Sequence, residues 1–316
     1  MTGAAGFIGS NLVDRLLDDG EMVVGYDNFS TGMPEFIESA NRHGNFTFVQ
    51  GDLLDARSLI EAMRGSRRVV HLAANADVRF GLAHPRKDLE QNTIATFNVL
   101  EAMRANNVGE IAFSSTGSIY GEATVVPTPE DAPFPVQTSL YGASKLACEG
   151  MIAAYAEGYG IRARIFRFVS ILGQRYSHGH VFDFMMQLAR DQTKLHILGD
   201  GKQRKSYLHV DDCIEAMLLA LNTRDEGVGI FNLGTEEVCE VLDSVDWIVR
   251  RLRLAPLLSF SGGRQGWIGD NPLIYLDTTR IRRLGWQPKS RIREAVEHTV
   301  DWLDTNRWVF EKRRGA

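Results

Sequence analysis

The chain has 316 residues, of which 44% are hydrophobic and 24% charged, values of an ordinary globular protein that exclude a disordered or fibrous chain. Thirty-five basic and forty acidic side chains give a net charge of -5, so there is no overall positive field to attract nucleic acid. The longest apolar run, residues 216–221, is far shorter than the roughly 20 residues of a membrane helix. We expect neither a nucleic-acid partner nor a membrane span.

Cysteine usage and the first residues bear on the compartment. Cys148, Cys213 and Cys239 are widely spaced, without the short clusters of a zinc site, and three cysteines cannot all pair with each other. No basic segment followed by an apolar stretch opens the chain, so no export signal is apparent. We therefore expect free thiols in a reducing cytoplasm, and no metal.

Short apolar runs alternate with helical patterns up to about residue 168, which is typical of a β-α-β chain. The runs lack polar alternation, so we expect strands that are covered on both faces, as in a doubly wound parallel sheet of the α/β class. A loop is expected at 127–135. The expected strands are 22–26, 46–50, 68–72, 110–114, 163–168 and 230–233, and the expected helices are 8–19, 56–63, 93–105 and 140–157.

A glycine-rich segment opens the chain. Gly3, Gly6 and Gly9 recur every three residues before an amphipathic helical pattern. Gly3 and Gly6 allow the backbone to approach a pyrophosphate, whose charge the N–H groups at the helix start would meet, and Gly9 allows close packing of helix and strand. An ordinary tight turn between strand and helix is the alternative interpretation.

Asp27 strengthens the dinucleotide interpretation. It ends a strand about twenty residues after the glycines, where a carboxylate can accept both hydroxyl groups of an adenosine ribose. Asp27 would repel a 2′-phosphate, and residues 28–31 supply no arginine, so NAD is favoured over NADP. Asp52, after the next strand, is a candidate for a hydrogen bond to adenine, or an ordinary cap of the following helix.

The strand that should precede the glycine loop is missing from the pattern. Only Met1 and Thr2 stand before Gly3, although a dinucleotide fold needs a central strand there. We therefore expect a truncated first strand or a misplaced start. A sheet without its middle strand would leave buried backbone groups of the neighbouring strands unpaired.

Tyr141 and Lys145 lie four residues apart in a helical pattern and so project from one face. A phenol with a pKa of about 10 is a poor base at neutral pH, but an ammonium and a positive nicotinamide ring close to it would lower that pKa. Such a pair also arises by chance, and its place in the chain is what favours a site. Thr116 follows a strand that should end at the cofactor, where its hydroxyl can bond the substrate hydroxyl that Tyr141 deprotonates.

Five motifs together resemble the extended short-chain dehydrogenase/reductases of the NAD-dependent epimerase/dehydratase family, most of all its UDP-glucose 4-epimerases. The likeness covers nearly the whole chain. The motifs are T-G-A-A-G-F-I-G (2–9), H-L-A-A (71–74), S-S-T-G-S-I-Y-G (114–121), Y-G-A-S-K (141–145) and G-D-G-K-Q-R-K-S-Y-L-H-V (199–210).

The resemblance implies the domains and the residue roles. Residues 1–170 and 207–235 would form an NAD-binding Rossmann domain, and residues 171–206 and 236–316 a smaller α+β lobe that binds a nucleotide-sugar. Tyr141 would be the acid/base and Thr116 would orient the sugar, while Lys145 would hold the nicotinamide ribose and tune Tyr141. The implied NAD contacts are Gly3, Gly6, Phe7, Ile8, Gly9, Asp27, Asn28, Asp52, Leu53, Leu72, Ala73, Ala74, Ser114, Tyr141 and Lys145.

The implied reaction is inversion at C4 of a UDP-sugar through a transient 4-keto sugar, with UDP-glucose and UDP-galactose favoured. Gly117 and Ser118 stand where 4,6-dehydratases of the family have Asp-Glu, which argues against that reaction. UDP-glucuronate and UDP-N-acetylhexosamine 4-epimerases, and a dehydratase that uses the same intermediate, remain alternatives. A dinucleotide sensor on this fold has no need of Thr116, Tyr141 and Lys145 together.

The resemblance also points to residues that contact the substrate. Lys205, or Arg204 before it, would bind the diphosphate in place of the family's usual arginine. Arg264 resembles the family's second diphosphate arginine, and a solvated surface charge is the alternative for both arginines. Ser170 replaces the usual substrate-binding Asn, and Leu198 an aromatic that stacks on uracil. Arg79 would reach the substrate or cofactor, or form a loop salt bridge with Asp77.

A homodimer is the remaining implication of the resemblance. In relatives, the helices equivalent to 92–106 and 141–158 form the dimer interface. Phe97, Met103, Met151 and Tyr155 are candidates for that surface. Core residues at the same helical spacing would produce the same pattern.

Overall fold

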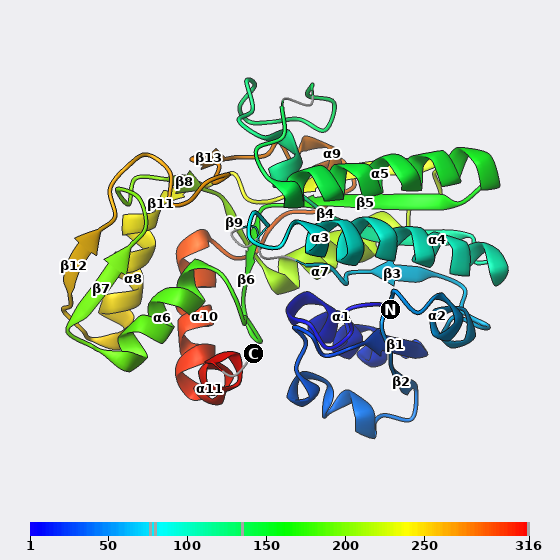
Figure 1. Ribbon diagram of the computed structural model, residues 1–316, viewed down its shortest axis with the longest axis horizontal. Helices are drawn as coiled ribbons and strands as arrows, with labels where there is room; N and C mark the ends of the chain where they lie inside the picture. The colour runs from blue at the N-terminus through cyan, green and yellow to red at the C-terminus, as the bar shows by residue number, and fades with distance from the viewer. Residues whose placement is uncertain (76–77, 79–80, 134–135, 315–316) are drawn as a thin grey trace.

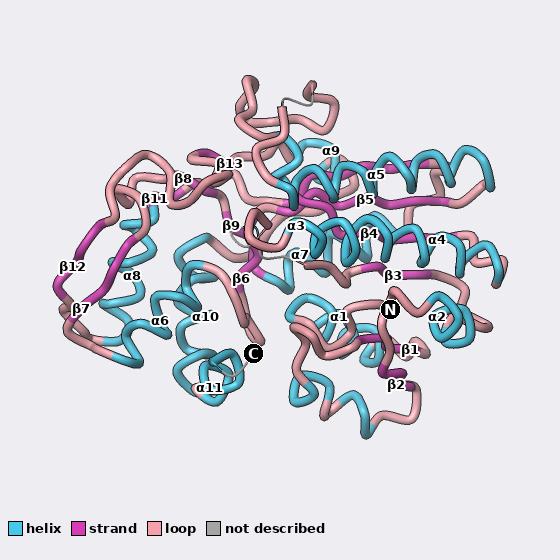
Figure 2. Tube along the Cα trace, viewed as in Figure 1, coloured by secondary structure: helices cyan, strands magenta, loops and turns pink. Residues whose placement is uncertain are grey.

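The computed structural model describes residues 1–75, 78, 81–133 and 136–314. Figure 1 shows a parallel sheet with its helices at one end of the molecule and a smaller, mostly helical part at the other. Long loops connect the elements of the smaller part and cross between the two parts (Figure 2).

Six strands form the main sheet, and neighbouring strands run parallel. One pair joins β1 (Val23–Asp27) to β2 (Phe46–Gln50). The other four lie in the order β10 (Val228–Leu233), β5 (Arg162–Phe168), β4 (Glu110–Thr116) and β3 (Val69–His71). The expected doubly wound α/β fold is confirmed, with strand ends within two residues of the expected ones.

Two sets of helices cover the sheet. On one face, α1 (Phe7–Asp18) packs against α7 (Val210–Leu221). On the other, α4 (Ala95–Ala105) lies between α2 (Ala56–Ala62) and α5 (Leu140–Tyr159). The helix expected at 93–105 is present, and its first two residues belong to η4 (Leu89–Ile94), a π-helix that continues directly into α4. Short helical segments in the connections are η1 (Pro34–Ile37), η2 (Ala40–Arg42), α3 (Pro85–Asp88) and η5 (Gly117–Tyr120).

Met1 and Thr2 occupy the place of the central strand, between β1 and β3. Thr2 forms parallel bridges with Tyr26 of β1 and His71 of β3. The N–H of Thr2 donates to the Val70 carbonyl at 3.0 Å, and the N–H of Tyr26 donates to the Met1 carbonyl at 2.8 Å. Two residues therefore satisfy backbone groups that we expected to be unpaired, and they join the two groups of strands into one sheet.

The smaller part packs α6 (His180–Arg190), α8 (Val241–Leu252) and α10 (Ile292–Thr305) together around a buried apolar core. Its strand β7 (Lys194–Ile197) pairs with β12 (Leu257–Phe260), and β8 (Arg204–Lys205) lies between β11 (Cys239–Glu240) and β13 (Leu273–Ile274). The parallel pair β6 (Ser170–Leu172) and β9 (Tyr207–His209) connects this part to the main sheet. The short helix α9 (Thr279–Arg282) contacts β10.

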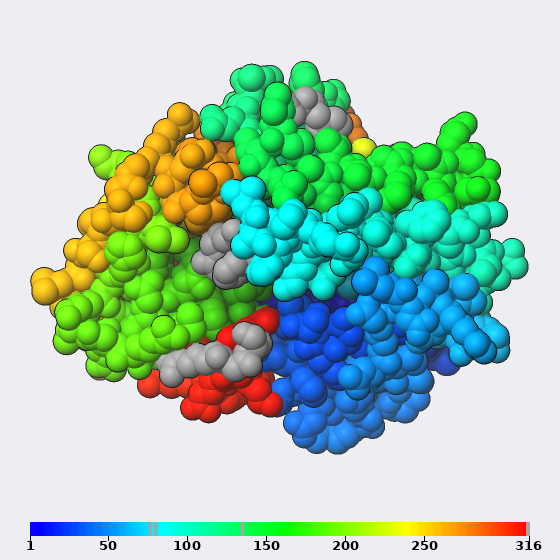
Figure 3. Space-filling view, in the orientation of Figure 1, coloured from blue at the N-terminus to red at the C-terminus, as the bar shows by residue number. Residues whose placement is uncertain are grey.

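The last helix, α11 (Trp308–Arg314), returns to the N-terminal part of the chain. Lys312 forms an ion pair with Glu35 at 2.6 Å, and Arg313 donates to the Thr31 carbonyl at 2.7 Å. Figure 3 shows the C-terminal segment, in red, beside N-terminal segments, in blue, on one face. The three cysteines are free and buried. Within the described residues, we find no helix with the length and apolarity of a membrane span.

His71 makes the stability of the fold depend on pH. Its Nδ1 hydrogen-bonds Thr2 Oγ1 at 2.7 Å and its Nε2 hydrogen-bonds Thr96 Oγ1 at 3.0 Å. Burial lowers the pKa of His71 from 6.5 to about 3, so the folded state keeps the ring neutral while the unfolded state takes up a proton. The contribution of this group is complete above pH 6.5 and is lost as the pH falls toward 3.

We predict that each pH unit below 6.5 removes about 1.4 kcal/mol of unfolding free energy through this one group. The measurement is urea unfolding of the natural chain and of His71→Asn at neutral and mildly acidic pH. The variant should be less stable at neutral pH and should lose less stability on acidification. An equal loss in both proteins would contradict this role of His71.

Candidate functional site

A cavity of about 860 Å³ lies between the main sheet and the smaller part. Its wall begins at the loop before α1, passes the carboxyl ends of the sheet strands and continues to β8 and the loop before β13. Every residue predicted from the resemblance to contact NAD lines this cavity, as do Thr116, Ser170, Leu198 and Lys205. Tertiary structure therefore gathers most of the predicted site into one space.

The loop from Gly3 to Gly9 forms one end of the cavity. Gly3 has a φ of +70°, and a Cβ atom on it would lie 2.7 Å from the Ala73 backbone nitrogen. A Cβ on Gly9 would lie 1.9 Å from the Gly3 carbonyl oxygen. These contacts require glycine at both positions, and they let α1 start directly at the cavity wall. Gly6 caps α1 without a side-chain hydrogen bond, so the amides of the first turn are open to a ligand there.

Asp27 ends β1 at the same place. Its carboxylate accepts the Ala5 N–H at 3.0 Å and the Phe29 N–H at 2.8 Å, which fixes its orientation and leaves lone pairs on both oxygens. Burial raises the pKa of this carboxyl group, and its backbone hydrogen bonds lower it. The carboxylate is thus a built acceptor at the edge of the cavity.

Asp52 does not cap the helix that follows it. Its side chain accepts from the Leu54 N–H at 2.9 Å and from Asn28 Nδ2 at 3.0 Å. The cap of α2 is Asp55, which accepts the Ser58 N–H at 3.1 Å. Asp52 instead holds the turn after β2 against the residue that follows Asp27.

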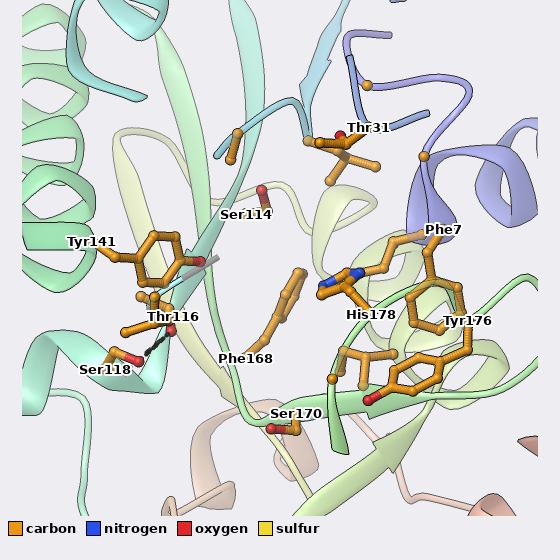
Figure 4. Close-up of a pocket in the computed structure, with 18 of the residues that line it drawn as sticks. Phe7, Thr31, Ser114, Thr116, Ser118, Tyr141, Phe168, Ser170, Tyr176 and His178 are labelled. Atoms are coloured by element: carbon orange, nitrogen blue, oxygen red, sulfur yellow. Dashed lines mark hydrogen bonds between the residues drawn. The ribbon is translucent and has the colours of Figure 1, made fainter. Parts of the chain in front are cut away.

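Tyr141 and Lys145 project from the first turns of α5 into the cavity wall. The helix starts here because Ser139 accepts the Gly142 N–H at 3.0 Å, a typical N-cap. Figure 4 shows the Tyr141 hydroxyl beside Thr116 at the end of β4. Lys145 is only 2% exposed, and its ammonium donates to the Ser114 carbonyl at 2.7 Å. Thr116, Tyr141 and Lys145, the predicted catalytic residues, therefore line the same cavity.

The electrostatics of the triad differ from the sequence-based expectation. Burial raises the pKa of Tyr141 to about 12, and a hydrogen bond with Thr116 lowers it. Lys145 is turned toward Ser114, with its Nζ 4.5 Å from the centre of the Phe113 ring. Thr116, rather than the ammonium, is thus the described partner that favours the Tyr141 phenolate in this structure.

The opposite end of the cavity contains Lys205, one of the residues predicted to bind the diphosphate. Lys205 Nζ lies 2.6 Å from Asp270 Oδ1 and 4.8 Å from the centre of the Trp267 ring. Asp270 is buried and also accepts the Gly266 N–H at 3.0 Å. An anionic ligand at Lys205 would therefore meet an ammonium that is already neutralised in part.

Two predicted substrate arginines do not line the cavity. Arg204 and Lys205 are neighbours on β8, so their side chains point to opposite sides of the strand, and Arg204 is exposed. Arg264 is exposed in the loop after Gly262 and Gly263. Arg204 and Arg264 are thus not among the residues that line the cavity, and their contact with a diphosphate stays a prediction. Arg79 lies outside the described residues.

Sequence reasoning missed a group of polar and aromatic residues on the wall opposite Tyr141. Tyr176 stacks with His178, and Phe7 packs edge-on against Tyr176 (Figure 4). Gln203 and Tyr207 lie within the motif at 199–210, and Trp267 follows Arg264 by three positions. The missed lining residues include Tyr176, His178, His180, Asp183, Gln187, Gln203, Tyr207, Trp267, Asp270 and Asn271.

The His, Cys, Asp and Glu side chains of the chain include the residue types that bind metal ions. Across the described parts of the chain, no three His, Cys, Asp or Glu side chains are grouped to hold a metal ion. His180 hydrogen-bonds Ser244 at 3.2 Å, and burial lowers the pKa of His180 to about 3. His209 caps α7 by accepting the Asp211 N–H at 3.2 Å and contacts His298.

Comparison with known proteins places this site in a family. Residues 1–234 match the NAD dependent epimerase/dehydratase family. A putative UDP-glucose 4-epimerase of Methanocaldococcus jannaschii is 32% identical over 97% of this chain and 98% of that protein. The UDP-glucose 4-epimerase of Mycolicibacterium smegmatis is 34% identical over 96% of this chain and 97% of that protein.

Solved structures agree with these relatives. A crystal structure of a UDP-galactose 4-epimerase superposes with a TM-score of 0.87 at 36% identity, over 97% of this chain and 98% of that one. The UDP-glucuronic acid 4-epimerase from Bacillus cereus, solved with UDP-glucuronic acid and NAD, superposes with a TM-score of 0.89 at 27% identity, over 96% and 98% of the two chains. The chain therefore belongs to the NAD dependent epimerase/dehydratase family.

Proposed function

We propose that this protein inverts C4 of a UDP-sugar with bound NAD, and that UDP-glucose and UDP-galactose are its substrates. The observation that carries the proposal is the convergence of Thr116, Tyr141 and Lys145 on a cavity that also contains the glycine loop and Asp27. In this proposal, residues 1–170 and 207–235 hold NAD, and residues 171–206 and 236–316 hold the nucleotide-sugar.

The residues at the glycine loop fit NAD. The first turn of α1 offers amides to a pyrophosphate, because Gly6 provides no side-chain cap. A side chain at Gly3 or Gly9 would collide with the backbone, so glycine at both positions keeps this tight loop possible. Asp27 presents an anchored carboxylate to the adenosine ribose, which disfavours the 2′-phosphate of NADP. When bound, NAD supplies the hydride acceptor and donor for C4.

Tyr141 then acts on the proton of the C4 hydroxyl. It takes that proton as C4 becomes a ketone and returns it as the hydroxyl forms again, while Thr116 holds the same oxygen. With a pKa raised to about 12 by burial, the phenol needs positive charge near it to work as a base at neutral pH. When NAD is bound, Lys145 would hold the nicotinamide ribose, and its ammonium and the positive ring of NAD would supply such charge.

Inversion requires the 4-keto sugar to turn about its link to the diphosphate. Lys205, Ser170 and Leu198 line the end of the cavity where we place the nucleotide. Gly117 and Ser118 provide no carboxylates next to Thr116, so the site has no dehydratase pair at that position. UDP-glucuronate, UDP-N-acetylhexosamines and a dehydratase reaction are the alternatives that the assay below distinguishes.

We further propose a cytoplasmic homodimer that forms through α4 and α5. These helices pack side by side, and Phe97 on α4 is 44% exposed. Met103, one of the four residues expected at the interface, is fully buried in the core. The expectation that Met103 belongs to the interface was therefore wrong. Met151 and Tyr155 are partly exposed on α5.

Replacing Tyr141 by Phe tests the acid/base assignment. The change removes only the hydroxyl, so we expect NAD retention to persist while turnover falls by about 10²–10⁴-fold. Turnover and NAD content of the purified protein are both measured. Tyr159→Phe, at the far end of α5, is the matched control and should retain full activity. Undiminished turnover in Tyr141→Phe would refute the assignment.

A panel of UDP-sugars tests the substrate and the reaction. UDP-glucose, UDP-glucuronate and UDP-N-acetylglucosamine are each incubated with the protein and followed by NMR and mass spectrometry. We expect UDP-galactose to form from UDP-glucose with no change in mass. Loss of water would identify a dehydratase, and conversion of another sugar alone would reassign the substrate.

Substitution of Phe97 by Glu tests the dimer. A charge on the apolar surface of α4 should convert a species with the mass of two chains into one with the mass of a single chain. The control is Leu257→Glu on β12, which is 76% exposed and distant from α4 along the molecule (Figure 1). Light scattering after gel filtration gives the masses, and a natural chain with the mass of one copy would exclude the dimer.

A further inference from the structure

Three consecutive residues at the end of β4 each contact a different residue of α5. The Ser114 carbonyl accepts from Lys145 at 2.7 Å, and the Ser115 hydroxyl donates to Glu149. The Tyr141 hydroxyl lies beside Thr116 (Figure 4). Because positions 141, 145 and 149 are four residues apart, they form one face of the helix. Glu149 is the member of this face to which the proposed reaction gives no role.

Glu149 is a buried carboxylate with a fixed partner. It is 5% exposed, and Arg167, which is 1% exposed, donates to both of its oxygens from Nε at 3.1 and 3.2 Å and to Oε2 from its NH2 group at 2.7 Å. Arg167 stands on β5 directly beside Ser115 and also donates to Tyr120 Oη at 2.6 Å. Burying such a pair costs desolvation of both charges, so the pair is weak evidence of a gain in stability.

Lys145 is the charged group that Glu149 influences. On its own helix the charges that act on the ammonium are those of Cys148 and Glu149; from β3 it faces the neutral ring of His71, and from β4 it faces the Ser114 carbonyl and the Phe113 ring. Arg167 on β5 is paired with Glu149.

The surroundings of Lys145 bring the pKa of its ammonium to about 8, close to neutral pH. Burial lowers the pKa of Lys145 to about 8, while Cys148 and Glu149 raise it. Glu149 therefore opposes the loss of the Lys145 proton at mildly alkaline pH.

We propose that Glu149, held by Arg167 and Ser115, is a positioning residue that keeps Lys145 charged and holds the end of β4 against α5, and that it thereby sets how tightly the protein holds NAD. The inference rests on the proposed contact between Lys145 and the nicotinamide ribose. It does not depend on which sugar is converted, because its main readout is NAD binding.

The test measures the dissociation constant of NAD from neutral to alkaline pH by calorimetry, with Lys145→Met as the reference. In the natural chain, binding should weaken as Lys145 loses its proton, and Lys145→Met should lack this pH dependence. Glu149→Gln keeps the size of the side chain and one acceptor oxygen but removes the charge, and its NH2 group cannot accept from Arg167. We expect it to move the midpoint of weakening to lower pH by about one unit.

Glu110→Gln is the matched control. Glu110 stands at the other end of β4, between Arg68 and Arg162 at 2.6 Å from each, so the change removes a paired carboxylate far from Lys145. The midpoint should remain that of the natural chain. This control separates a general loss of stability from an effect on Lys145.

Two results would overturn the proposal. The first is a folded Glu149→Gln protein in which NAD binding weakens at the same midpoint pH as in the natural chain. The second is NAD binding that has the same pH dependence in the natural chain and in Lys145→Met. If Glu149→Gln does not fold, the double variant Glu149→Gln, Arg167→Gln leaves no unpaired buried charge and is measured instead. The same shift in the double variant supports the proposal, and an unshifted midpoint overturns it. An inactive protein with the expected NAD profile would refute the proposed epimerisation alone.

Discussion

The attachment of α5 to the end of β4 determines the geometry of the whole site. Ser114 and Ser115 are hydrogen-bonded to Lys145 and Glu149, and Thr116 lies beside Tyr141, so one helical face is held to one strand end at three successive residues. Positions on one face of a helix cannot move independently. The triad is therefore rigid because of backbone elements, rather than because of a mobile loop.

Burial sets the charge state of the groups at this junction. It raises the pKa of Tyr141 to about 12 and lowers that of Lys145 to about 8. Both shifts favour the neutral forms, and in a region with little water each added charge has a large effect on its neighbours. Glu149 raises the pKa of Lys145, and the positive nicotinamide ring of bound NAD would lower the pKa of Tyr141. Each of these charges therefore favours the ionised form of its neighbour.

The cavity has a different character at its two ends. At the glycine loop, backbone amides and a fixed carboxylate receive a ligand without large side-chain movement. At the other end, Lys205 is already paired with Asp270, so a diphosphate must compete with a buried carboxylate for the ammonium. The first end therefore presents unpaired donors and acceptors, whereas the ammonium of the second end already has a carboxylate partner.

The sequence alone was sufficient for the fold class, the parallel strands, the glycine loop and the candidate triad, because these features depend on local periodicity and on fixed spacings along the chain. It was insufficient where contacts join distant residues. Thr2 joins two groups of strands, β8 turns Arg204 away from the cavity while Lys205 faces it, and Asp270 meets Lys205 across 65 positions of the chain. Strand pairing, side-chain direction and burial arise only when elements pack together, so the tertiary structure decided which charges reach the cavity and in which protonation state.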